Sequence, residues 1–281
     1  MKKKYDLIFL SIGKNIENYI SLYFQFLKQL NIKTSFRILS IIGENDSKDK
    51  TLYLINEELK KAKYDFVHLN LSFLKNIKDR VERISLGREY LLQFIKKKKI
   101  ASKYIIVVDI DDVLPNKINL NKFKIILKLL NDNRLELFGI SIKSEPIYYD
   151  LYPLLIKDYY EYPISEFRKL NRSPFKYYLL RKKRVMNFQK KITLMNDVKT
   201  ISSHNGMTVY LYKDYVKSSY IRTQNSEISE HLSFNNKLHL LTKKHILMTN
   251  EIKFKAPSEH INNNLCSILF NFIKKNLIKL K

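Results

Sequence analysis

The sequence predicts an α/β protein whose mostly parallel, twisted sheet carries helices on both faces. Strand-like and helix-like segments alternate through residues 1–140, which is the first observation behind this prediction. The second is that the predicted strands are apolar and run into polar turns. The third is composition: 45% of the 281 residues are hydrophobic, enough for a sizeable core, and glycine (5) and proline (6) are scarce.

The spacing of apolar residues places each element of the first half in order. Strands are expected over residues 5–12, 34–42, 66–71, 104–110 and 137–143. Helices are expected over residues 16–30, 52–64, 81–99 and 123–133. The helix over 81–99 ends in four lysines, which suits its macrodipole.

After residue 144 the pattern is looser. A strand is expected over 204–212, a short helix over 226–238 and a late strand over 245–252. We expect irregular structure over 145–155 and loops or helices above the open face over 157–193. Residues 262–281 predict a basic amphipathic helix, which could pack on the domain or lie on an acidic membrane surface.

The charge is strongly positive, at +25 from 52 Lys and Arg against 27 Asp and Glu. This excess attracts anions such as nucleic acids, acidic lipids and phosphorylated ligands. The lysines are scattered along the chain, however, and no nucleic-acid-binding motif accompanies their short clusters, so a compositional bias also explains them.

The single cysteine, Cys266, excludes an internal disulfide and a cysteine-rich zinc site, and it fits a reducing compartment. The apolar run at the N-terminus is too short for a signal peptide, and no segment reaches the length of a membrane span. We therefore expect a cytoplasmic protein, with peripheral membrane contact as an open alternative.

Three polar turns should open on one crevice, because ligands of such sheets bind beyond the carboxyl ends of the strands. These turns read SIGKN, GENDS and DIDD. In the last, Asp109 and Asp111 stand two residues apart at a strand end, where carboxylates can bind Mg²⁺ or Mn²⁺ and leave positions for water and phosphate. The structural alternative is a strand end with solvated aspartates and Asp112 capping the turn.

Other residues of this crevice suit an anionic nucleotide. Arg83 and Arg88 lie on the preceding helix and could make bidentate phosphate contacts, or else pair with a neighbouring glutamate on the helix surface. Glu44 and Asn45 could hydrogen-bond a base or ribose, although the same turn could simply cap the next helix. Ser11 follows the first strand and could face the nucleotide.

Seven segments, in this order, resemble the DxD glycosyltransferases of the GT-A fold over most of residues 5–250. They are FLSIGKNIENYI, IIGENDSKDKT, RISLGREYLL, YIIVVDIDD, PIYYDLYPLL, HNGMTVYLYKDY and SEHLSFNNKL. Within these enzymes the sequence is similar to capsule-associated sugar transferases of the fungal α-1,3-mannosyltransferase type. It departs from them at Lys50, which replaces a glycine, at Pro153, which replaces an alanine, and at residues 204–206, where His-Asn-Gly replaces a pair of small residues.

The resemblance implies a metal-dependent enzyme that moves a hexose from a nucleotide-diphosphate sugar to a hydroxyl of a glycan or lipid-linked acceptor. Asp109 would contact ribose or metal, and Asp111 would bind the Mn²⁺ or Mg²⁺ directly. Glu230 would face the acceptor and take its proton, and His231 would complete the metal sphere or contact the diphosphate. Asp150 is a second acceptor-side candidate that could instead satisfy tyrosine hydroxyls.

The resemblance also divides the chain into a catalytic domain over 1–255 and a C-terminal helix over 256–281. Within the catalytic domain, residues 1–113 would bind the nucleotide sugar and residues 114–255 the acceptor. Two other functions stay open. One is an α/β protein that binds nucleic acid or an anionic surface without catalysis. The other is a nucleotidyltransferase, which also uses paired aspartates with metal but predicts a glycine-rich loop, whereas SIGKN has one glycine.

Overall fold

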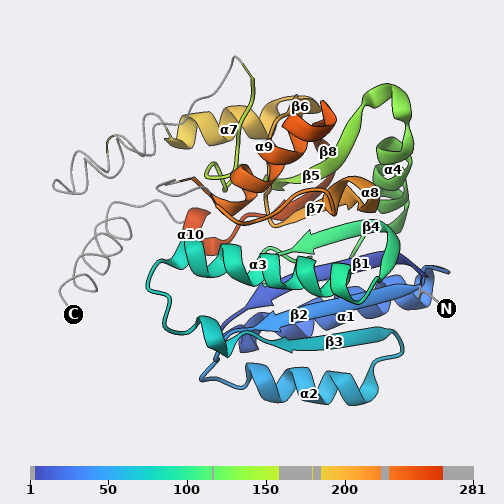
Figure 1. Cartoon of the computed structure of the whole chain (residues 1–281). Helices are drawn as coiled ribbons and strands as arrows, with labels where there is room; N and C mark the ends of the chain where they lie inside the picture. The colour runs from blue at the N-terminus through green and yellow to red at the C-terminus, as the bar shows by residue number, and fades with distance from the viewer. Residues whose placement is uncertain (1–3, 116, 158–178, 180–184, 223–227, 262–281) are drawn as a thin grey trace.

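The computed structural model describes residues 4–115, 117–157, 179, 185–222 and 228–261. Within these residues the strands form one eight-stranded sheet in the order β3-β2-β1-β4-β7-β5-β8-β6 (Figure 1). The predicted α/β class is confirmed.

The first four strands are parallel and follow the apolar runs of the sequence. They are β1 (Lys4–Gly13), β2 (Ile38–Glu44), β3 (Asp65–Asn70) and β4 (Ala101–Val108). β1 and β4 lie inside the sheet and are buried over most of their length, as strands covered on both faces must be. Their carboxyl ends form one edge, and the three polar turns predicted to share a crevice follow β1, β2 and β4 there.

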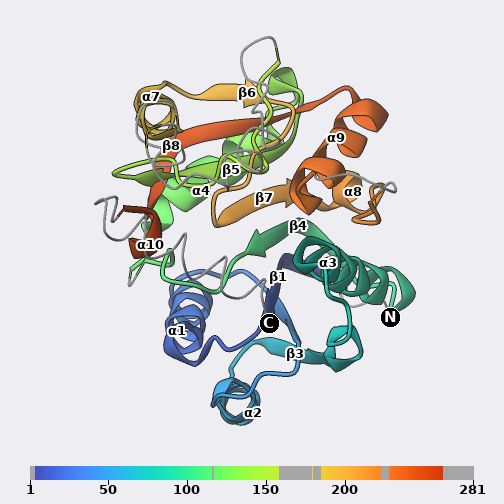
Figure 2. The same cartoon turned by 90° about the vertical axis from the view of Figure 1, so that its left-hand side faces the viewer.

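The second half of the sheet is mixed. It consists of β5 (Leu137–Glu145), β6 (Val198–Thr200), β7 (Met207–Leu211) and β8 (His245–Lys255). β7 runs antiparallel between β4 and β5, β8 is parallel to β5, and β6 is antiparallel to β8 (Figure 2). Four of the seven strand pairings are parallel, so the prediction of a mostly parallel sheet is confirmed.

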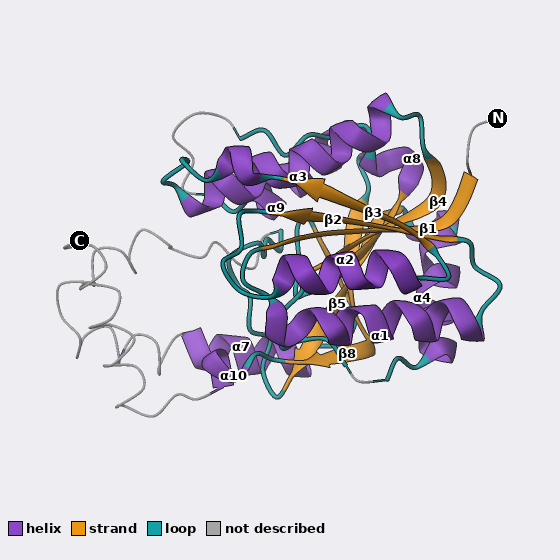
Figure 3. Cartoon of the chain, turned by 90° about the horizontal axis from the view of Figure 1, so that it is seen from below, coloured by secondary structure: helices purple, strands orange, loops and turns teal. Residues whose placement is uncertain are grey.

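Helices cover both faces of the sheet, because its inner strands point apolar side chains alternately to either side. Phe9 and Ile106 pack with the helices α1 (Glu17–Lys33), α2 (Thr51–Lys61) and α4 (Leu120–Asn131). Ile8 and Ile105 pack with α3 (Arg80–Lys97), α8 (Tyr212–Tyr215) and α9 (Glu230–Thr242) on the other face. Figure 3 shows α1 and α3 on opposite sides of the strands.

Shorter or peripheral elements complete the described part of the chain. They are η1 (Ser72–Leu74), η2 (Asn133–Leu135), α7 (Asn187–Leu194) and α10 (Ser258–Ile261). Among the described helices, none combines the length and the apolar character that crossing a bilayer requires.

The second half departs from the predicted elements in small ways. The irregular stretch predicted over 145–155 is confirmed, whereas β6 and α8 were not predicted. The helix predicted from residue 226 begins at Glu230, because the Ser229 hydroxyl accepts the Leu232 N–H and caps it there. Most of residues 157–193 and the whole C-terminal helix predicted over 262–281 lie outside the described residues.

Lys143 in β5 is fully buried, which is unusual for a lysine. Its Nζ donates to the carbonyls of Met195 and Asn196, at 2.6 and 3.1 Å. Burial lowers its pKa from 10.5 to about 8. Between these values the unfolded chain holds more protons than the folded chain, so the free energy of unfolding should rise with pH across this window.

Replacing Lys143 by methionine should remove this pH dependence. The stability of Lys143→Met minus that of the unmodified protein should fall by about 1 to 3 kcal/mol as pH increases from 8 to 10.5. Denaturant unfolding at several pH values measures this difference, and the other titrating groups cancel because both proteins carry them. A difference that stays constant over the window would show that the pKa of Lys143 is ordinary.

Candidate active site

The junction of β4 and β7 forms the centre of the site. Because these strands are antiparallel, Val108 at the end of β4 pairs with Met207 at the start of β7. Asp109 comes directly after β4, and its N–H donates to the Gly206 carbonyl at 2.9 Å. His204 precedes β7, and its Nε2 lies 3.1 Å from Asp109 Oδ2. Strand pairing thus places an imidazole against the first carboxylate of DIDD.

Arg88 on α3 forms ion pairs with two carboxylates of the site, Asp109 and Glu230. Its Nη2 donates to Asp109 Oδ1 at 2.9 Å and its Nε to Glu230 Oε1 at 3.3 Å, with the side chain 8% exposed. Burial would lower the pKa of Arg88, but Asp109 and Glu230 raise it above its ordinary value. The arginine is therefore held as a cation between two carboxylates, rather than paired with a glutamate on its own helix.

Asp109 is correspondingly held as an anion. Burial would raise its pKa, but His204 and Arg88 lower it well below the ordinary value for an aspartate. Its two oxygens face different partners, Oδ1 the guanidinium and Oδ2 the imidazole.

His231 in the first turn of α9 stacks on His204. The two ring centroids are 3.7 Å apart at an interplanar angle of 18°. The ring is buried, and neither of its nitrogens makes a hydrogen bond, although Nε2 lies 3.6 Å from Glu230 Oε1. Burial, His204 and Arg88 lower the pKa of His231 well below its ordinary value. His231 is therefore a neutral imidazole with a lone pair available to a ligand.

Asp109, His204 and His231 together form a group that could hold a metal ion. One ligand atom from each lies within 4.8 Å of the others. A buried imidazole without a hydrogen bond is costly unless something binds it, and a divalent cation is the natural partner of such a set. The residues present therefore fit a bound cation.

The other two aspartates of DIDD lie outside this group. Asp111, predicted as the direct metal ligand, accepts the Val113 N–H through Oδ1 at 3.2 Å. Asp112 accepts from the N–H and the hydroxyl of Ser258 at 2.9 and 3.1 Å, at the start of α10. Asp112 therefore makes a tertiary contact that holds the start of α10, while the role of Asp111 stays a prediction.

Asp150 lies close enough to the acidic cluster to be affected by it. Burial raises its pKa to about 8, and the charges of Asp109 and Glu230 add to this rise. Its Oδ1 accepts the Tyr152 N–H at 3.0 Å. Near neutral pH, Asp150 is therefore mainly a protonated carboxyl group, in contrast to Asp109.

The residues expected to face a nucleotide lie where β1 and β2 end. Gly13 pairs with Glu44 at this edge, and the Asn45 N–H donates to the Gly13 carbonyl at 3.1 Å. Ser11 lies two residues before Gly13 in β1 and is fully buried. Glu44 Oε1 accepts the Ser47 N–H at 2.5 Å, so this carboxylate helps to hold its own turn.

The turns after β1 and β2 are tied together by their polar side chains. The N–H groups that open α1 need acceptors, and the ENDSKDKT turn supplies them. Asn15 N–H donates to Ser47 Oγ, Ile16 N–H to Thr51 Oγ1 and Glu17 N–H to Asp49 Oδ2, at 2.9, 2.8 and 3.2 Å. Much of this motif therefore shapes the crevice edge.

Arg83 lies five residues before Arg88 on α3 and makes a different contact. Its Nη1 donates to the Ile77 carbonyl at 2.7 Å. The structure therefore brings Arg88, Asp109, Glu230 and His231 together, as the sequence suggested, and places Arg83 on a nearby turn.

Sequence reasoning did not assign a site role to His204. The sequence analysis noted only that His-Asn-Gly at residues 204–206 replaces a pair of small residues. This replacement is the signal from which a role for His204 could have been predicted. What was missing was the antiparallel insertion of β7 beside β4, which no local pattern reveals.

Gly206 allows the chain before β7 to approach Val113, in the turn that follows β4. Its φ is +85°, and a Cβ there would lie 2.9 Å from Val113 Cγ2. Gly206→Ala should therefore destabilise the fold by about 1 to 3 kcal/mol. Denaturant unfolding measures this, with Gly87→Ala on α3 as control, because there the added methyl meets only side chains at 3.3 Å or more. Equal stabilities of the two variants would contradict the prediction.

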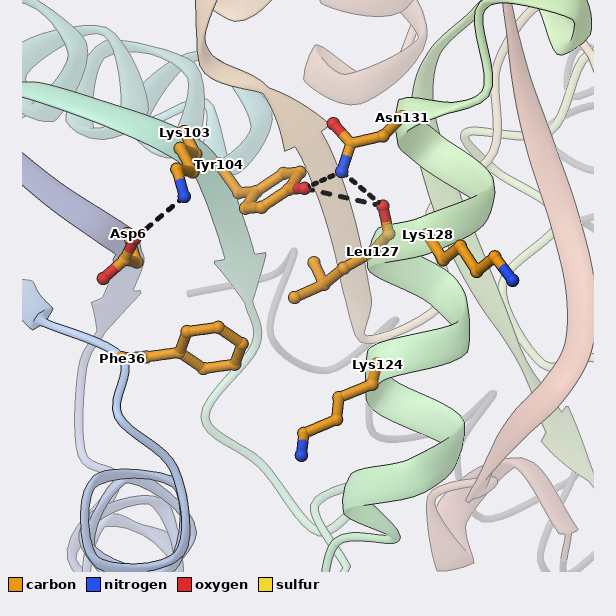
Figure 4. A pocket seen from close by; sticks show the side chains of 8 residues that line it. All are labelled: Asp6, Phe36, Lys103, Tyr104, Lys124, Leu127, Lys128 and Asn131. Carbon is orange, nitrogen blue, oxygen red and sulfur yellow. Dashed lines mark hydrogen bonds and ion pairs between the residues drawn. The ribbon is translucent and has the colours of Figure 1, made fainter.

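A separate pocket lies at the amino ends of β1 and β4, away from this site (Figure 4). It has a volume of about 210 Å³. Lys103, Lys124 and Lys128 line it together with Phe36. The carboxylate cluster stands at the opposite ends of the same strands, so the two features are independent.

Solved structures share this fold. The mannosyltransferase PcManGT from Pyrobaculum calidifontis, solved with GDP-Man and Mn²⁺, is 9% identical with a TM-score of 0.50, covering 96% of this chain and 65% of that one. The chain has a GT-A-like fold. Residues 1–349 of S. aureus TarS match at 15% identity and TM-score 0.48, and M. tuberculosis glucosyl-3-phosphoglycerate synthase matches at 10% and 0.45.

The matched proteins are longer than this chain. The match to the TarS fragment covers 91% of this chain but only 62% of the fragment. The match to the synthase covers 94% of this chain and 75% of the synthase. No protein-family model and no curated protein matches the sequence. At these identities the likeness concerns the fold.

Proposed function

We propose that this protein is a metal-dependent glycosyltransferase that moves a hexose from a nucleotide-diphosphate sugar to a hydroxyl of a glycan or lipid-linked acceptor. The observation that carries the proposal is the cluster of half-buried Asp109 with the buried side chains of His231 and Arg88 at the carboxyl end of β4. Ligands of α/β sheets bind at this edge. The related fold of PcManGT, solved with GDP-Man and Mn²⁺, supports the choice of ligand.

Asp109 and His231 would hold a Mn²⁺ or Mg²⁺ ion. Bound there, the cation would neutralise the diphosphate as it departs from the sugar. Arg88 fixes Asp109 and Glu230 through separate nitrogens, so that the carboxylates keep their positions as charge is rearranged nearby. The narrower likeness to capsule-associated mannosyltransferases, and the role of Asp111 as a ligand, stay predictions.

We assign donor binding to residues 1–113 and acceptor binding to residues 114–255. Glu44 and Asn45 stand at the edge where the base and ribose would lie. Donor contacts from Ser11, which is fully buried, and from Arg83, which bonds the Ile77 carbonyl, stay predictions. The positive charge of the chain would help to recruit an anionic donor. It would also favour a cytoplasmic protein working beside an acidic membrane that carries a lipid-linked acceptor.

Glu230 and Asp150 are the candidate bases for the acceptor hydroxyl. Asp150 would act only when ionised, and a cation bound nearby would lower its pKa from about 8. Glu230 is positioned by Arg88 at the start of α9. The two carboxyl groups influence each other, because the charge of Glu230 contributes to the raised pKa of Asp150.

The variant Asp150→Asn should separate binding from catalysis. The amide keeps an oxygen for the Tyr152 N–H but cannot take a proton from an acceptor. We expect unchanged metal-dependent donor binding and a loss of transfer of about 10²- to 10⁴-fold. Radiolabelled sugar transfer and donor titration measure the two quantities. Full transfer activity in the variant would show that Asp150 is not the catalytic base.

A screen for ligand-induced stabilisation tests the proposed function. UDP- and GDP-sugars would be added to the protein with and without Mn²⁺, and the melting temperature recorded. We expect at least one donor to raise it only when metal is present, because binding to the folded state stabilises it. Asp109→Asn should abolish the shift, and Asp6→Asn, at the far end of β1, should retain it.

Two outcomes would count against the proposal. One is that no donor produces a metal-dependent shift; the other is that the shift survives unchanged in Asp109→Asn. Tight, salt-sensitive binding of DNA, together with the first of these outcomes, would favour the nucleic-acid-binding alternative instead.

A further inference from the structure

We infer that the cation is held by two histidines and one carboxylate, with His204 as a ligand beside His231 and Asp109, and that this centre selects Mn²⁺, Fe²⁺, Co²⁺ or Zn²⁺ over Mg²⁺. The inference rests on the proposed function for what the ion does, and it adds which residues hold the ion and which ions are accepted. It adds His204 to the ligands expected from the sequence, which were Asp109, Asp111 and His231.

The distance between His204 and Asp109 suits two ligands of one ion. Two ligands about 2.1 Å from a metal and at right angles to each other lie about 3 Å apart. His204 Nε2 and Asp109 Oδ2 are 3.1 Å apart, and the His231 ligand atom is within 4.8 Å of both. Asp111 is not part of this group.

Thr208 supplies the outer contact that a metal-binding histidine needs. Its fully buried Oγ1 lies 2.8 Å from His204 Nδ1. When the hydroxyl accepts the Nδ1 proton, Nε2 presents its lone pair toward Asp109, which is the tautomer required for binding through Nε2. β7 therefore provides both the ligand, just before the strand, and the residue that orients it.

His231 is the second observation that points to a ligand. It is 3% exposed, and both of its nitrogens lack hydrogen bonds. Buried polar atoms in folded proteins are nearly always paired, so an imidazole left in this state needs an explanation. Coordination explains it, because a His231 ligand atom lies within 4.8 Å of those of His204 and Asp109.

The chemistry of these ligands decides which ions fit. Imidazole nitrogen suits transition-metal ions, whereas Mg²⁺ prefers carboxylates, phosphates and water. The charges also favour a cation, since Asp109 and Glu230 are paired with one positive side chain, Arg88. A doubly charged ion would leave the cluster positive and ready for a diphosphate.

Metal binding alone, without nucleotide sugar, tests the inference. Chelator-treated protein would be titrated with Mn²⁺, Co²⁺, Zn²⁺ and Mg²⁺ by calorimetry, and free Mn²⁺ followed by electron paramagnetic resonance. We expect the dissociation constant for Mn²⁺ to be at least about tenfold below that for Mg²⁺. Electron spin echo spectra of the Mn²⁺-bound, unmodified protein should show nitrogen couplings from imidazole.

Variants identify the ligands. His204→Gln and His231→Gln should each weaken Mn²⁺ binding at least about tenfold, and Thr208→Val about tenfold, with recovery in Thr208→Ser. Asp112→Asn should bind Mn²⁺ as the unmodified protein does, because Asp112 contacts Ser258. His239→Gln, which alters a histidine that bonds the Lys244 carbonyl, controls for loss of any histidine. Circular dichroism verifies that each variant is folded.

The inference fails if Mg²⁺ binds as tightly as Mn²⁺, or if the spin echo spectra show no nitrogen. It fails equally if Asp111→Asn loses the ion while His204→Gln keeps it. Absence of binding by every ion would make the cluster an ion-free network. If an ion binds as expected but no nucleotide sugar does, the proposed function fails while this assignment stands.

Discussion

Asp109→Asn is expected to reduce sugar transfer by about a thousandfold or more, the largest effect on activity of any single substitution in this chain. Among the described residues, Asp109 is the one that contacts both Arg88 and His204 and belongs to the candidate metal-binding group. The amide keeps the shape of the carboxylate but has no charge and only one acceptor oxygen. It therefore cannot face a guanidinium, an imidazole and a cation together.

Asp112→Asn is the matched control, because it changes the same kind of residue three positions later. Asp112 contacts Ser258 and lies outside the candidate metal-binding group. Steady-state transfer rates with a donor found by the screen give the comparison. If Asp109→Asn stays active while Asp112→Asn does not, the site has been built around the wrong aspartate.

Arg88→Met should have the largest effect on stability, lowering the free energy of unfolding by about 3 to 5 kcal/mol. The substitution leaves Asp109 and Glu230 without their cation in a setting where both are largely removed from water. An uncompensated buried charge costs more than the original pair contributed, which is why loss of one partner is so destabilising. Denaturant unfolding at neutral pH measures the effect.

Arg83→Met on the same helix is the control, and it should cost about 1 kcal/mol, since it removes one hydrogen bond to the Ile77 carbonyl. Combining Arg88→Met with Asp109→Asn should recover part of the loss, because one unpaired charge disappears. A coupling of about 1 to 3 kcal/mol is expected from this double-mutant cycle. Strictly additive effects would show that Arg88 and Asp109 do not interact in solution.

The first half of the fold was predictable because its signals are local. Apolar runs gave β1 to β4, helical spacing gave the intervening helices, and the change of period marked the turns. The second half was harder to predict. β6 has only three residues, and β7 lies antiparallel between β4 and β5, both of which are far from it in the sequence. Such pairings depend on tertiary contacts, which the spacing of apolar residues along the sequence does not predict.

The site divides along the same line. Asp109, Arg88, Glu230 and His231 belong to elements with clear patterns, and the structure brings them together. His204 required knowledge of the β4–β7 pairing. The hydrogen bond of Asp111 could not be predicted either, because it depends on the turn after β4, in which Oδ1 accepts the Val113 N–H. The polar ENDSKDKT turn suggested nucleotide contacts, yet several of its side chains hold α1 instead.

The most direct test of the central claim is the coupling between metal and nucleotide. Calorimetry would give the affinities of UDP and GDP for the unmodified protein with and without Mn²⁺. We expect Mn²⁺ to raise the affinity for at least one of them by about tenfold or more, and by linkage that nucleotide should tighten Mn²⁺ binding by the same factor. Equal nucleotide affinity in the presence and absence of metal, for both UDP and GDP, would contradict a metal-dependent nucleotide-sugar site at Asp109.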